Sequence, residues 1–234
     1  LAYRPESRLR LMLQRAPIAE RVLAGDEPYE ADLTVAVGDL PYVLGMADHD
    51  AIPPSIAIPV IAEREIRMAS RLTALGPPPH IGVSWRAGTQ GVARRLDKEA
   101  PLAALAQALA PVRATFVAVQ RHPAAGEIAA MAEAVGQPVH DLADVNDDLE
   151  NMLALVGLLD DYVAVSNTNV HLRAARGRTS RVLVPHPPEF RWLAAGRESP
   201  WFPGCRLYRQ AADGDWTSAL ETLARDLRRS EPDV

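Results

Sequence analysis

The stretch DYVAVSNTNVHL, Asp161 to Leu172, decides the fold of this chain. Tyr162 to Val165 is a short apolar, β-branched run, which is typical of a buried parallel strand. The run stops at four small polar residues, Ser166 to Asn169, and each of them is a favourable helix N-cap. Helix formers follow as far as Gly177, so a strand, a polar turn and a helix N-terminus are predicted to meet at one point.

The polar turn is a candidate anion site, because free backbone N–H groups and the helix dipole favour an anion, typically phosphate, at a helix N-terminus. Ligands of open α/β sheets bind at the carboxyl ends of strands, where this turn is expected to lie. Asn167, Thr168 and Asn169 are therefore predicted to lie beside a ligand. An ordinary β-to-α turn without a ligand explains the same stretch and stays open as the alternative.

Composition limits the function classes. Of the 234 residues, 48% are apolar and 24% charged, as in globular proteins, and no apolar run is long enough to span a bilayer. The start shows no signal pattern, and the single cysteine, Cys205, fits a reducing compartment, so we expect a cytoplasmic protein. The net charge of −5 gives no overall basic field, so nucleic acid is not an expected partner.

Strands and helices alternate regularly after the Gly-Pro-Pro-Pro run at residues 76–79. The predicted strands are residues 80–85, 114–120, 138–142, 162–166 and 181–185, and the predicted helices are 102–109, 127–135, 149–159, a helix from Asn169, and 217–227. This order indicates βαβ units and an α/β fold with a doubly wound, Rossmann-like parallel sheet. The aromatic-rich residues 190–216 are expected to be irregular. The prolines predict a boundary between a partial N-terminal domain with its linker, residues 1–79, and a C-terminal domain, residues 80–234.

The pattern before the prolines is less regular. Helices are predicted at residues 9–13 and 62–75, and a strand at Asp32–Val37. Residues 48–59 contain three prolines and no helical period, so we expect a loop there. Leu1 to Tyr3 is typical of the end of a strand, and we therefore expect the chain to begin inside a domain.

Polar residues also follow the first two strands after the prolines, and the carboxyl ends of parallel strands meet at one edge of a sheet. The candidate residues are Trp85, Arg86 and Gly88 after the first strand, with Arg94 or Arg95 further along, and Gln120 and Arg121 after the second. Gly88 lets the backbone approach a ligand. Arg86, Arg94 or Arg95 is a candidate to pair bidentately with phosphate. His171 faces the same loop, either as a hydrogen-bond donor to a diphosphate or sugar hydroxyl, or as a structural histidine.

Several blocks resemble the glycosyltransferase-like region that follows tetratricopeptide repeats in many bacterial proteins. The blocks are Ile81–Trp85, Val119–Gln120, Leu159–Leu172, Pro188–Leu193, Ser199–Pro203, Arg206–Gln210 and Gly214–Trp216. That region is similar to the heptosyltransferases and the O-linked N-acetylglucosamine transferases, which share the GT-B architecture of two facing Rossmann-like domains. The resemblance covers residues 80–217 well and residues 1–79 loosely.

The resemblance implies a metal-independent glycosyltransferase without a cofactor, whose C-terminal domain binds a nucleotide-diphosphate sugar. A protein, a glycan or a lipid-linked saccharide is the implied acceptor. The implied roles are phosphate binding by Arg95 and Thr168, sugar binding by Asn167 and His171, and lining of the site by Trp85 and Gln120. P-loop, G-x-G-x-x-G and G-x-S-x-G motifs are absent, and no zinc spacing is present. Asp48-His49-Asp50 has the D-x-D form of some metal-binding glycosyltransferases, but its proline-rich context favours a solvated turn.

Two features depart from the family pattern. Heptosyltransferase-like proteins carry Asp-Thr at the central strand end, whereas this chain carries Asn167-Thr168. The opening strand and Gly-rich loop that supply the catalytic base of heptosyltransferases have no counterpart here, so no base is assigned, and Asp39, His49 and Asp50 are only candidates. A catalytically inactive GT-B scaffold module attached to a repeat domain is therefore the alternative. A nucleotide-sugar epimerase would need carboxylates at the strand ends, and these are scarce.

Overall fold

The computed structural model describes residues 1–46, 52–87 and 98–229. The chain divides into two compact units, Leu1–Pro59 and Val60–Val234. Helix α3 (Ala62–Leu75) forms where it was predicted and packs against α6 (Leu149–Leu158). Because of this packing, the structure divides the chain before α3, whereas the predicted boundary lies after it.

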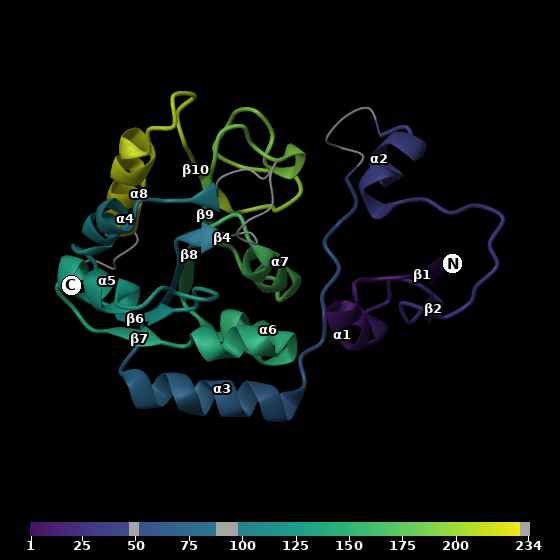
Figure 1. Ribbon diagram of the computed structural model, residues 1–234, viewed down its shortest axis with the longest axis horizontal. Helices are drawn as coiled ribbons and strands as arrows, with labels where there is room; N and C mark the ends of the chain where they lie inside the picture. The colour runs from purple at the N-terminus through teal and green to yellow at the C-terminus, as the bar shows by residue number, and fades with distance from the viewer. Residues whose placement is uncertain (47–51, 88–97, 230–234) are drawn as a thin grey trace. The chain divides into compact units, whose positions relative to one another are not determined.

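The second unit is built on a six-stranded parallel sheet with helices on both faces (Figure 1). The strands are β3 (His80–Ser84), β6 (Thr115–Ala118), β7 (Val139–Asp141), β8 (Asp161–Val165), β9 (Arg181–Val184) and β10 (Arg206–Arg209). Helices α4 (Leu102–Leu109), α5 (Glu127–Val135) and α8 (Thr217–Arg229) pack as one layer, and α3, α6 and α7 (Thr168–Ala175) as the other. The predicted α/β fold with a doubly wound parallel sheet is confirmed.

The strand order is β10-β9-β8-β3-β6-β7, and every neighbouring pair is parallel. The chain therefore runs outward from β3 through β6 to β7, crosses back to β8, and continues outward through β9 to β10. The crossing makes β3 and β8 neighbours at the centre of the sheet. In open α/β sheets such a reversal of strand order marks the place where ligands bind.

Close packing between β3 and β8 requires a glycine. A Cβ atom at Gly82 would lie 2.5 Å from Leu159 Cδ1 and 2.9 Å from Tyr162 Cδ2. The Tyr162 ring is fully buried, and its hydroxyl is 2.9 Å from Ser84 Oγ. This contact joins the side chain of Tyr162, near the start of β8, to Ser84 at the end of β3, and the same hydroxyl accepts from Asn167 in the predicted turn.

Arg173 of α7 joins two helices from inside the core, where it is 2% exposed. Its guanidinium donates to four backbone carbonyls, those of Val156 (2.5 Å), Leu159 (2.9 Å), Asp160 (3.2 Å) and Thr179 (2.6 Å). The first three lie at the C-terminal end of α6, where helix carbonyls lack intrahelical partners and a cation is favourable. Arg173 thus holds α7 against α6 and fixes the direction in which α7 leaves the turn.

Two predictions about local structure are wrong. Asp32–Val37 is not a strand: residues 33–36 have no regular structure, η2 (Val37–Asp39) is a 3-10 helix, and α2 (Leu40–Val43) follows. No described strand pairs with this run, and a proline in the first turn of α2 favours a helix start. The aromatic-rich segment is not irregular throughout, because it contains η5 (Phe190–Trp192) and the edge strand β10.

The first unit is small. Strands β1 (Ala2–Tyr3) and β2 (Arg21–Val22) pair in parallel, with η1 (Ser7–Leu9) and α1 (Arg10–Gln14) between them. The predicted helix near residues 9–13 is confirmed as α1.

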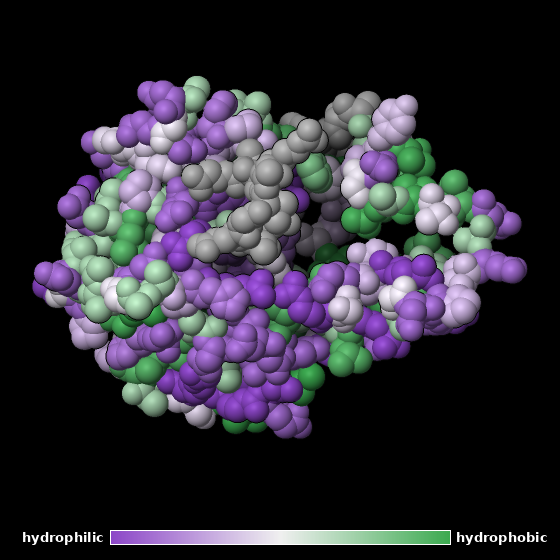
Figure 2. All heavy atoms as spheres, in the orientation of Figure 1, coloured by the Kyte–Doolittle hydropathy of each residue, from purple (hydrophilic) through white to green (hydrophobic). Residues whose placement is uncertain are grey.

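Most of the exposed large apolar side chains described belong to the first unit, and Figure 2 shows some of them as green spheres. In that unit they include Leu33, Val37, Tyr42 and Leu44, whereas the second unit contributes Ile66 and Phe190. None of the described helices is both long enough and apolar enough to cross a membrane.

Candidate functional site

The candidate site lies at the carboxyl edge of the sheet, where β3 and β8 end side by side. Ser84 is paired with Ala164 in the sheet register, so the residues that follow each strand leave the sheet together. On the β3 side the chain enters a short antiparallel ribbon, β4 (Arg86–Ala87) with β5 (Lys98–Glu99), which was not predicted. On the β8 side it enters the turn before α7.

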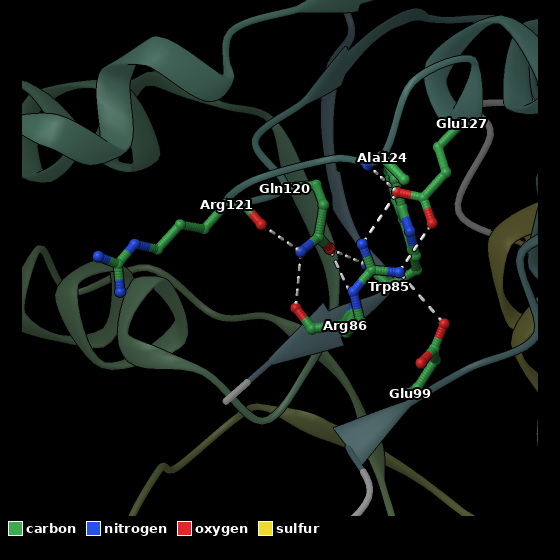
Figure 3. A network of polar contacts seen from close by, with 7 residues as sticks. All are labelled: Trp85, Arg86, Glu99, Gln120, Arg121, Ala124 and Glu127. Carbon is green, nitrogen blue, oxygen red and sulfur yellow. Dashed lines mark hydrogen bonds and ion pairs between the residues drawn. The ribbon is translucent and has the colours of Figure 1, made fainter. Parts of the chain in front are cut away.

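Gln120 fastens the end of β3 to the chain that follows β6 (Figure 3). Its Oε1 accepts from the backbone N–H groups of Trp85 (3.0 Å) and Arg86 (2.9 Å), and its Nε2 donates to the carbonyls of Arg86 and Arg121 (both 3.0 Å). Two acceptor sites and two N–H groups are the full capacity of an amide. Gln120 is 2% exposed, so it positions the backbone of the site.

Arg86 is engaged in ion pairs (Figure 3). Its guanidinium meets Glu127 bidentately at 2.7 and 3.0 Å and Glu99 at 3.2 Å. The hydrogen bonds from Arg86 lower the pKa of Glu127, and the same hydrogen bonds raise the pKa of Arg86. The predicted phosphate ligand Arg86 is thus held by the carboxylates of Glu127, at the start of α5, and Glu99 of β5.

The other candidates near β3 differ in their surroundings. The Trp85 side chain is fully buried in the core, whereas Arg121 is exposed. Figure 3 shows the Arg121 guanidinium directed away from the Arg86–Glu127 pair, and no ion pair joins it to a described residue. The remaining candidates, Gly88, Arg94 and Arg95, together with His49 and Asp50, lie outside the described residues.

The turn after β8 has the predicted form, with Asn167 as N-cap of α7. Its Oδ1 accepts from the Val170 N–H (3.1 Å), and its Nδ2 donates to the Tyr162 hydroxyl (3.2 Å). Asn169 is buried and donates to Asn146 Oδ1 (3.3 Å), whereas Thr168 is exposed. Of these three predicted residues, Thr168 is the one whose side chain faces solvent.

A charged cluster that was not predicted lies at the same edge, and we call Lys98, Ser166, Glu189 and Arg191 the Glu189 cluster. Lys98 Nζ and Arg191 Nη1 contact Glu189 Oε1 at 2.8 and 2.6 Å. Ser166 Oγ donates to Glu189 Oε2 at 2.5 Å. Segments far apart in the sequence, namely β5, the end of β8 and η5, are thus joined around one carboxylate.

The contacts around Glu189 favour the ionised form of its carboxyl group. Trp192 Nε1 can only donate, and it donates to Ser166 Oγ at 2.8 Å, so the Ser166 hydroxyl proton points to Glu189. Burial raises the pKa of Glu189, but hydrogen bonds from Lys98 and Ser166, with the charges of Lys98 and Arg191, outweigh it and lower the pKa to about 2. The cluster is therefore two cations around one anion.

His171 packs against two aromatic rings beside the cluster. Its ring meets Phe202 edge-on at a centroid distance of 4.9 Å and lies 6.4 Å from Trp192. Burial lowers the pKa of His171, the charges of Arg191 and Lys98 lower it further, and Glu189 opposes them, leaving a pKa of about 4. The imidazole is neutral near pH 7 and offers hydrogen bonds but no charge.

Comparisons with known proteins bear on the fold. No model of a known protein family matches the chain. Protein FlbA of Caulobacter vibrioides is 26% identical over 162 residues, which are 68% of this chain and 26% of FlbA. The chain thus spans about a quarter of the length of this relative.

Two solved structures resemble the chain. A glycosyl transferase of family 9 from Veillonella parvula matches 93% of this chain and 57% of its own, with a TM-score of 0.51 and 10% identity. The ADP-heptose lipopolysaccharide heptosyltransferase II of E. coli matches 77% of this chain and 57% of its own, with a TM-score of 0.50 and 17% identity. The chain shares the α/β fold of these two glycosyltransferases.

Because His171 is held neutral by burial, we expect the free energy of unfolding to depend on pH in the acid range. His171 titrates at about 4 in the folded chain and near 6.5 when unfolded, so the stability it contributes is present above pH 6.5 and is lost as the pH falls to 4. One pKa unit corresponds to about 1.4 kcal/mol, so the loss is on the order of 2 to 3 kcal/mol. His171→Asn should flatten the unfolding free energy, measured by urea titration, across this window. An unchanged pH profile would show that the ring is not held neutral.

The sequence did not predict the Glu189 cluster because its members come from segments that are far apart in the chain and meet only in the fold. Lys98 is the sole lysine of the chain, and Glu189 stands in a Pro-Glu-Phe-Arg-Trp block, but neither fact shows that the two side chains meet. Among the described residues, no group of three or more His, Cys, Asp and Glu side chains is placed to hold a metal ion.

Proposed function

We propose that this chain is the donor-binding part of a GT-B glycosyltransferase and that it binds a nucleoside-diphosphate sugar at the carboxyl edge of β3 and β8. The observation that carries the proposal is the position of two cations, Lys98 and Arg191, beside the turn that opens α7, at the reversal of strand order. Phosphate groups bind where helix N–H groups and cations converge.

The diphosphate is the part of the ligand that this edge suits best. Asn167 caps the N–H of Val170, and the N–H groups of Thr168 and Asn169 in the first turn have no intrahelical acceptor. The exposed Thr168 hydroxyl adds a neutral hydrogen bond, and Lys98 and Arg191 add charge. Arg95, which lies outside the described residues, is also proposed to bind phosphate, as the sequence resemblance implies.

The sugar side is defined by neutral groups. Asn167 has both amide atoms in hydrogen bonds that hold the turn, so the replacement of the family's aspartate by asparagine preserves the turn without its charge. His171, kept neutral by burial, is proposed to bind a sugar hydroxyl. The acceptor is proposed to be a protein, a glycan or a lipid-linked saccharide, with residues 1–79 forming part of the acceptor side.

The wider setting is also part of the proposal. Following the sequence resemblance, we propose a bacterial, cytoplasmic protein in which this region accompanies tetratricopeptide repeats.

A catalytically inactive binding module is the second candidate. The observation that favours it is that the described cations nearest the β3 and β8 ends are already paired, Arg86 with Glu127 and Lys98 with Glu189. A site that had lost its ligand would keep such pairs as structural contacts.

Calorimetric titration of the chain with uridine, guanosine and adenosine diphosphates and their sugars tests the proposal. We expect at least one diphosphate to bind in the micromolar range, because charge-assisted hydrogen bonds contribute about 1.5 to 3 kcal/mol each. No binding of any of them at millimolar concentration would favour the inactive module. Transfer of labelled sugar to an acceptor then separates a binding module from an enzyme.

A further inference from the structure

Glu189 fills a position that favours an anion. Its carboxylate contacts Ser166, the residue directly before the N-cap of α7, and both cations of the Glu189 cluster. The positive end of the α7 dipole lies at the same turn. The chain therefore supplies one negative charge of its own to the place where the proposed function puts a diphosphate.

The segment that carries Glu189 is firmly anchored. Arg209 of β10 donates to the carbonyls of Trp192 (2.5 Å), Leu193 (2.9 Å), Ala195 (3.0 Å) and Gly196 (2.7 Å). These four bonds hold the loop after η5 against the edge strand.

Aromatic contacts anchor the same segment from the other side. The Trp192 ring stacks on Phe202 with centroids 4.7 Å apart, and its Nε1 donates to Ser166. Because backbone and side chain are both fixed, Glu189 is not placed to leave when a ligand arrives. An incoming anion must then share Lys98 and Arg191 with it.

We propose that Glu189 is a specificity-determining residue of this anion site, which makes the site select diphosphates over monophosphates. The inference rests on the proposed function, since it concerns the same edge of the sheet. A monophosphate would contact only Lys98 and Arg191, whose charges Glu189 already neutralises in part. It would also be repelled by the negative charge of the Glu189 carboxylate. A diphosphate has a second charged group, which can lie against the α7 N–H groups while the first shares the two cations.

The test compares phosphate selectivity in two charge-removing variants. Glu189→Gln keeps an oxygen that accepts from Ser166 and removes the negative charge. Glu198→Gln is the matched control, because the exposed Glu198 pairs with Arg206, which begins β10 at the opposite, amino edge of the sheet (3.3 Å). Uridine, guanosine and adenosine mono- and diphosphates are titrated into each protein by calorimetry.

We expect the wild-type chain to bind the preferred diphosphate about tenfold or more tightly than the matching monophosphate, since tenfold corresponds to about 1.4 kcal/mol. Glu189→Gln should tighten monophosphate binding about tenfold and diphosphate binding less, so that the ratio of the two affinities falls. Glu198→Gln should leave the ratio unchanged. If Glu189→Gln does not fold, Glu189→Asp, which withdraws the carboxylate from the cations, should move the ratio in the same direction.

Two results would overturn the inference alone. Diphosphate binding with an unaltered ratio in the Glu189 variant would show that the carboxylate does not select, and weaker binding of both ligands would show that it only holds the cations in place. If no nucleotide binds to the wild-type chain or to either variant, both the proposed function and this inference fail.

Discussion

Replacing Arg173 by methionine should lower the free energy of unfolding by about 3 to 5 kcal/mol, because four backbone carbonyls lose their charged donor. Arg173 is 2% exposed, and its guanidinium is the donor to four backbone carbonyls. Methionine fills part of the volume but donates nothing. Each carbonyl left unsatisfied in the core costs about 1 to 3 kcal/mol, and local relaxation reduces the sum.

Urea denaturation measures the Arg173 effect, provided that the slope of free energy against urea stays the same in both proteins. Arg178→Met is the control, because Arg178 is exposed and lies close along the same segment. Its effect should stay within about 0.5 kcal/mol. A loss below about 1 kcal/mol in Arg173→Met would mean that water or a shifted backbone satisfies the α6 carbonyls. Arg173 would then not be what holds α7 against α6.

Lys98→Met should weaken nucleoside-diphosphate binding about tenfold to a hundredfold. A charge-assisted hydrogen bond contributes about 1.5 to 3 kcal/mol, and each 1.4 kcal/mol is a factor of ten in affinity. The loss should fall in the upper part of this range, because removing Lys98 also leaves Glu189 with one fewer counter-charge beside the phosphates. Binding of the uncharged nucleoside should change little.

Arg206→Met is the matched control for Lys98→Met. Arg206 begins β10 at the amino edge of the sheet and pairs with the exposed Glu198. The variant removes one positive charge at the opposite edge of the sheet from the Glu189 cluster, so diphosphate affinity should stay within about twofold at physiological salt, where charges beyond about 8 Å are screened. Equal losses in the two variants would mean that net charge alone, and not the Glu189 cluster, attracts the ligand.

The sequence predicted well those features that depend on local pattern. The apolar run from Tyr162 to Val165 and the N-cap at Asn167 both lie where they were expected, because burial and capping leave periodic and compositional signals. The run at Asp32–Val37 has a similar composition but no described partner strand. A strand needs a neighbour, and composition does not supply one.

The site was predicted less well, because its chemistry depends on contacts between distant segments. Gln120 and Arg86 were assigned to a ligand from their place after strands, yet both are engaged by the protein itself. Strands β6, β7, β8 and β9 lie between Lys98 and Glu189 in the sequence, and the two side chains meet only in the fold. A strand-end position identifies the edge of a site, and only the structure shows which side chains remain available there.

Amide hydrogen exchange, measured with and without the nucleoside diphosphate that binds most tightly, tests the location of the proposed site most directly. We predict slower exchange at residues 166–170, 98–100 and 189–192, because the ligand should contact the α7 turn and the Glu189 cluster. The control peptides are those covering β10 from its amino end and α3, where exchange should stay the same. Unchanged exchange at the α7 turn under saturating ligand, or protection confined to other segments, would contradict the assignment of this edge as the donor site.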